Sequence, residues 1–260
     1  MWNALGTQFC LELGFGVLLA LAFVPKAPVG TLFYRVMGTT ALLPILIGVG
    51  APLAAGELAW SAPVVWAAAL SVLPYPLYSG PVRGRRWAVA LAVALLGSAV
   101  AVLLALPEIA LGSGPLARLS AAGSALSTGA VAGSVGLAMV LGHWYLTVPN
   151  LAVRHLRRLN RMSMGCMILS LVFVGATCLA FRAALERAET PLLGPTGLFY
   201  LGTRAAVGLF LPLLFAAMTE SSLRFGNTRS ATGILYASTV LVLIGTAVSV
   251  SLQDSYGLPL

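Results

Sequence analysis

Residues 122–148 read AGSALSTGAVAGSVGLAMVLGHWYLTV, and this apolar run decides the class of the protein. It contains no Asp, Glu, Lys or Arg. A helix needs about 20 residues to cross the hydrocarbon core of a bilayer, so the run is long enough to span a membrane. It lacks the alternation typical of a barrel strand. Small residues recur from Gly123 to Gly136, and they would let a neighbouring helix approach closely.

The composition of the whole chain agrees with a membrane protein. Hydrophobic residues (AVILMFWYC) make up 59% of the 260 residues and charged residues only 8%, whereas about 25% of an average soluble domain is charged. So few charges could not cover a soluble surface of this size. We therefore predict one all-α domain over residues 1–260, a polytopic transmembrane helix bundle of the plasma (inner) membrane of a bacterium.

Seven further apolar runs bring the predicted number of membrane spans to eight. The prolines at 63, 74 and 76 mark the third span as the most distorted, because each removes a backbone donor. The predicted spans are Leu5–Val24, Thr31–Ala54, Leu58–Tyr78, Trp87–Leu106, Ala122–Val148, Met164–Phe181, Leu198–Thr219 and Gly233–Leu252.

The loop charges predict an orientation. With eight spans, alternate loops lie on opposite sides; one side carries eleven of the 15 Lys and Arg residues and the other three, with Arg204 inside a span. Positive residues favour the cytoplasmic side, so both termini are predicted to lie outside the cytoplasm. The eleven are Lys26, Arg35, Arg83, Arg85, Arg86, Arg154, Arg157, Arg158, Arg161, Arg224 and Arg229, and the three are Arg118, Arg182 and Arg187.

The net charge of +8 comes mainly from the positive residues of these loops. We expect these positive residues to orient the protein in the membrane and to bind lipid headgroups, and we expect no nucleic-acid partner. The run Arg154–Arg161, with Leu156 and Leu159 among its arginines, predicts a short amphipathic helix that lies on the membrane and binds anionic headgroups.

Two ionisable residues fall deep inside the predicted spans. Glu12 lies about 12 Å and Arg204 about 9 Å from the outer side, at about 1.5 Å per residue. Because unpaired charges in hydrocarbon are costly, the simplest arrangement is a structural ion pair that joins the first span to the seventh. The alternative is a polar site for a proton, an ion or a headgroup.

His143 is the candidate ligand-binding residue. An imidazole can be an axial ligand of haem b, hydrogen-bond a quinone or carry a proton, and Gly142 beside it would leave room for a flat ring. Tyr145 and Arg35 are expected nearby, at the cytoplasmic side. The alternative is a histidine that only bonds a neighbouring carbonyl.

Several function classes are excluded or disfavoured. Lys26 is the only lysine and lies in a loop, so a retinal Schiff base within a span is excluded. No zinc-protease, serine-hydrolase, nucleotide-binding or haem-attachment motif occurs, so a stand-alone enzyme is not expected.

Two runs carry a resemblance. They are Gly142–Pro149 (GHWYLTVP) and Thr228–Tyr236 (TRSATGILY), which resemble recurring signatures of bacterial multi-pass membrane proteins associated with respiratory electron transfer. The resemblance implies a membrane subunit or accessory protein of a haem or quinone assembly, with other membrane subunits as partners. Two alternatives stay open, a small-solute or ion transporter and a structural or assembly protein without chemistry of its own.

Overall fold

The structure is a computed structural model that describes residues 2–24, 29–78, 84–106, 114–148, 151–187 and 191–256, with side chains from residue 4 onward. All regular secondary structure of these residues is helical, as predicted. Lys26 and Arg83, which belong to the charge count above, lie outside the described residues, as does Pro149.

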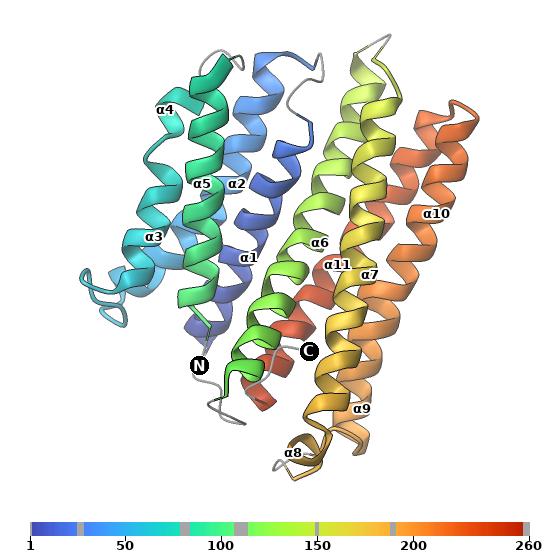
Figure 1. The fold of residues 1–260 in the computed structure, drawn as a ribbon. Coiled ribbons are helices and arrows are strands. Elements are labelled where there is room, and N and C mark those ends of the chain that lie inside the picture. Colours follow the sequence, from blue (N-terminus) through green and yellow to red (C-terminus); the bar gives the residue numbers. More distant parts are fainter. Residues whose placement is uncertain are drawn as a thin grey trace.

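The helices form one bundle of long rods that lie side by side (Figure 1). Seven rods are long and apolar enough to cross a membrane, and one of them is the continuous run of α9, η1 and α10. The start of α1 and the end of α11 lie at the same end of the bundle (Figure 1). The elements are α1 (Trp2–Ala22), α2 (Gly30–Ala54), α3 (Pro63–Val72), α4 (Tyr75–Tyr78), α5 (Gly84–Leu104), α6 (Pro115–Thr147), α7 (Arg154–Ala180), α8 (Arg182–Glu186), α9 (Pro195–Gly202), η1 (Thr203–Phe210), α10 (Leu211–Arg224) and α11 (Thr228–Tyr256).

The third predicted span is not one long helix. It is divided into α3, of 10 residues, and α4, of 4 residues, on either side of Leu73 and Pro74. Pro74 has no backbone N–H to donate to the preceding turn, and the helix is interrupted there, between the end of α3 and the start of α4. Among the described residues, seven helices rather than eight therefore reach membrane-spanning length, and the distortion lies where the prolines predicted it.

The arginine-rich run is not a separate helix on the membrane surface. It forms the first turns of α7, which continues without a break to Ala180. No Pro or Gly interrupts residues 154–164, so nothing ends the helix there. Leu156 and Leu159 are fully buried in the bundle rather than inserted into lipid.

A π-helix, η1, interrupts the rod that carries Arg204. Pro212 lies two residues after the end of η1 and lacks the N–H that an α-helix would pair with the carbonyl of Gly208. A wider π-type turn accommodates such a missing bond, and π-helical segments often mark functional sites. Gly208 also lies so close to α11 that an added Cβ would be 2.5 Å from Cα of Gly245.

The closest helix contact joins α1 to α6 and confirms the packing predicted for the small residues of residues 123–136. A Cβ on Gly16 would lie 1.7 Å from the carbonyl oxygen of Gly129, and one on Gly133 would lie 1.9 Å from the carbonyl carbon of Gly16. Only glycine permits this approach, which brings two backbones into van der Waals contact in the middle of the bundle.

The contact predicts opposite effects for two Gly→Ala changes on α6. Gly133→Ala forces the two backbones apart, and overpacking of this kind costs about 1–3 kcal/mol. Gly136→Ala meets no atom within 4 Å, and alanine is the better helix former by up to about 1 kcal/mol. Thermal unfolding of the purified protein in detergent should show a lower midpoint for Gly133→Ala and an unchanged or higher one for Gly136→Ala; equal midpoints would contradict the contact.

Candidate functional site

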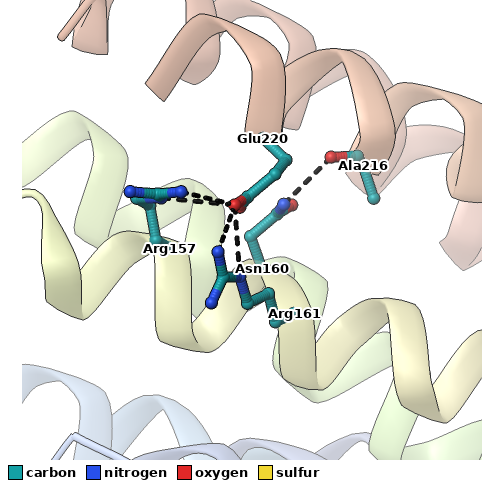
Figure 2. A network of polar contacts seen from close by, with 5 residues as sticks. All are labelled: Arg157, Asn160, Arg161, Ala216 and Glu220. Carbon is teal, nitrogen blue, oxygen red and sulfur yellow. Dashed lines mark hydrogen bonds and ion pairs between the residues drawn. The ribbon is translucent and has the colours of Figure 1, made fainter. Parts of the chain in front are cut away.

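Two arginines of α7 converge on one carboxylate of α10 at the arginine-rich end of the bundle (Figure 2). Oε1 of Glu220 accepts hydrogen bonds from Arg157 at 2.9 and 3.2 Å and from Arg161 at 2.7 and 3.1 Å. Glu220 is only 8% exposed, whereas the side chain of Arg161 is 61% exposed. The carboxylate therefore joins α7 to α10 and holds both guanidinium groups at the surface of the bundle.

A buried amide extends this network. Asn160 is fully buried, and its Nδ2 donates to the carbonyl of Ala216 at 2.9 Å (Figure 2). Its Oδ1, Oε2 of Glu220 and Oγ1 of Thr219 have no hydrogen-bond partner among the described residues. Such buried polar atoms are normally paired, so this interface has the polarity to hold ordered water.

Sequence reasoning missed Glu220 as a site residue. A signal was present, because the other carboxylates fall within the first span or on the cation-poor side, which leaves Glu220 as the one carboxylate next to the eleven cations. A single carboxylate among so many arginines is expected to find a partner.

Arg204 lies in the centre of the bundle and is 1% exposed. Its Nη2 donates to Oγ1 of Thr128 at 2.7 Å and to Oγ of Ser170 at 2.9 Å, and its Nη1 lies 3.4 Å from the carbonyl oxygen of Gly245. One guanidinium from η1 thus links α6, α7 and α11. Its Nε has no partner among the described residues.

Glu12 lies at the same level of the bundle but does not contact Arg204. The ion pairs among the described residues do not include the predicted Glu12–Arg204 pair. Instead, Oε1 of Glu12 accepts a hydrogen bond from Nε2 of Gln8 at 2.8 Å, while Oε2 has no partner among the described residues. The backbone of Glu12 packs against Gly129 and Arg204 bonds the preceding Thr128. The two buried charges therefore attract each other electrostatically without forming a direct ion pair.

His143 lies near the end of α6, on an exposed face. Its Nδ1 is 3.1 Å from the hydroxyl oxygen of Tyr236 on α11, and the two rings meet edge to face with centroids 6.4 Å apart. The expected space beside Gly142 is filled, because an added Cβ there would lie 2.8 Å from Oγ1 of Thr232. A flat ring could therefore approach the exposed imidazole but not Gly142.

The predicted neighbours of His143 are engaged elsewhere. The hydroxyl of Tyr145 donates to the carbonyl of Ala152, which ties the end of α6 to the start of α7. Arg35 lies on the exposed face of α2, where it lines a groove with Thr39 and Leu43. The tyrosine that the structure brings to the imidazole is Tyr236, which sequence spacing alone could not indicate.

The two runs that carry the sequence resemblance meet in space. Residues 142–147 close α6 and residues 228–236 open α11, and they touch through the pair His143–Tyr236 and through Gly142–Thr232. The second histidine, His155, lies in the first turn of α7. Within the described ranges, no cluster of three or more His, Cys, Asp or Glu side chains could hold a metal ion.

Comparisons of this chain with protein-family models, with curated proteins and with solved structures find no match.

The Glu220 network predicts a stability effect that an exposed ion pair lacks. Glu220→Gln removes the charge that faces two arginines, and a hydrogen bond to a charged group contributes about 1.5–3 kcal/mol. Glu186→Gln is the matched control, because Glu186 pairs with Arg182 at 2.9 Å on the exposed helix α8, where such pairs contribute under about 1 kcal/mol. Denaturant unfolding followed by circular dichroism should separate the two variants. Equal losses would contradict the role of Glu220 in joining α7 to α10.

Proposed function

We propose that this chain is a membrane subunit or accessory protein of an electron-transfer assembly and that it presents His143 to a haem or a quinone. The observation that carries the proposal is the hydrogen bond between Nδ1 of His143 and Tyr236 on an exposed face of the bundle. One ring nitrogen is fixed by a partner, and the other, Nε2, is left for a ligand. Ligating histidines are commonly oriented in this way by a second residue.

The tautomer of His143 decides which chemistry the site supports. If Nδ1 carries the proton and donates it to Tyr236, Nε2 keeps a lone pair that can bind haem iron. If the hydroxyl of Tyr236 donates to Nδ1, Nε2 carries the proton and can donate to a quinone carbonyl. Both arrangements use the same contact between α6 and α11.

The exposed position favours a ligand that comes from the membrane or from a neighbouring subunit. Quinones are dissolved in the bilayer and can reach an exposed imidazole directly. A haem would need a second axial ligand and a cover, and we propose that a partner subunit supplies both. The buried guanidinium of Arg204 uses its hydrogen-bond donors to link three helices and so does not offer them to a transported solute. Electron transfer is therefore preferred to solute transport.

We also propose eight crossings with both termini outside the cytoplasm, α3 and α4 together making the third. The charge count supports this topology. In Figure 1, α2, α5, α7 and α11 all begin at the same end of the bundle. This arrangement also supports the topology, because the arginines near these helix starts then face one compartment.

The topology predicts the behaviour of a C-terminal reporter. Alkaline phosphatase, which folds to an active enzyme only outside the cytoplasm, should be active when fused after residue 260 and inactive when fused after residue 226, in the α10–α11 turn. The reverse pattern would overturn the orientation, and equal activity at both positions would overturn the last crossing.

The ligand proposal is tested by visible spectroscopy and quinone titration of the purified protein. A haem would give reduced-minus-oxidised bands after dithionite that are lost in His143→Ala and kept in His155→Ala. A quinone would bind with about tenfold lower affinity to His143→Ala or to Tyr236→Phe, the cost of about one hydrogen bond. A colourless protein that binds no quinone in membranes containing its co-purifying partners would overturn the proposal.

A further inference from the structure

A groove of about 510 Å³ lies between α4 and the first half of α5. One wall is formed by Pro74 and Leu77. The other wall belongs to α5, which contributes Arg85, Arg86, Val89 and Val93. The broken third span creates this space, because the chain turns at Leu73–Pro74 where a continuous helix would pack along α5.

The groove is polar at its mouth and apolar along its length. Arg85 and Arg86 are exposed in the first turn of α5. Val89 and Val93 follow at helical spacing and are 52% and 38% exposed, and Leu77 opposite them is 57% exposed. Val93 lies about 10 Å along the helix from Arg86, at about 1.5 Å per residue. A ligand that fits has an anionic head and a long apolar tail.

Among the described residues, no ion pair neutralises the positive charge at the mouth of the groove. Arg85 and Arg86 take part in none of the ion pairs among the described residues, and no described carboxylate lines the groove. Both arginines also lie at a helix N-terminus, where the helix dipole is unfavourable for cations and favourable for an anion. By contrast, Arg157 and Arg161 of α7 already share the carboxylate of Glu220.

We propose that this groove binds one anionic phospholipid. Its phosphate lies between the guanidinium groups of Arg85 and Arg86 at the start of α5, and one acyl chain lies along Leu77, Val89 and Val93. The site uses none of the residues of the proposed haem or quinone site, so either can be true without the other.

Native mass spectrometry of the intact protein, titrated with phosphatidylglycerol or with phosphatidylcholine of the same acyl chains, tests the proposal. We expect one phosphatidylglycerol to bind at least about tenfold more tightly than phosphatidylcholine, given the contribution of basic residues near an anionic headgroup. The double variant Arg85→Gln/Arg86→Gln should lose this preference. Arg224→Gln/Arg229→Gln removes the same charge from exposed residues at the same end of the bundle and should keep it.

A second variant separates the acyl chain from the headgroup. Val93→Phe fills the groove without changing its charge and should lower phosphatidylglycerol binding about tenfold. If both double arginine variants lost the preference for phosphatidylglycerol equally, the binding would reflect only general charge attraction, and the proposal would be overturned. Unchanged binding in Val93→Phe would overturn the position proposed for the acyl chain.

Discussion

The contact between α1 and α6 is the constraint on which the rest of the structure depends. Gly16 meets Gly129 and Gly133 at distances that exclude any side chain, so the register of the two helices is fixed. That register places Glu12 beside Gly129 and hence at the level of Thr128, where Arg204 binds. If α1 were shifted along α6, Glu12 and Arg204 would lie at different levels of the bundle.

Polar side chains then tie the remaining helices to this central pair. Arg204 reaches α6, α7 and α11 from the π-helix η1, and Glu220 holds α7 against α10. Lipid offers no strong hydrophobic drive between helices, so close packing and such hydrogen bonds must supply the specificity of assembly. Among the described residues, Nε of Arg204 and Oε2 of Glu220 have no hydrogen-bond partner, and ordered water is expected beside these atoms.

Function is proposed at the surface of the bundle, whereas the buried charges of Arg204 and Glu220 join helices. His143 lies on an exposed face with one nitrogen held by Tyr236, and the groove beside Arg85 and Arg86 lies at the surface of the bundle. A subunit of a larger membrane assembly needs such exposed sites, because its ligands and partners arrive through the bilayer. A rigid, polar-linked interior would keep these surface groups in place.

The sequence by itself determined the all-helical membrane class and the position of most helices, because hydrophobic length and charge are local properties of the chain. It also located the distortion at Pro74 and Pro76 and the small-residue surface of α6. Tertiary structure alone decided the partners: Tyr236 rather than Tyr145 for His143, Thr128 and Ser170 rather than Glu12 for Arg204, and Arg157 and Arg161 for Glu220. Partners are set by how helices distant in sequence are rotated and aligned against one another, and the spacing along a single helix carries no information about that alignment.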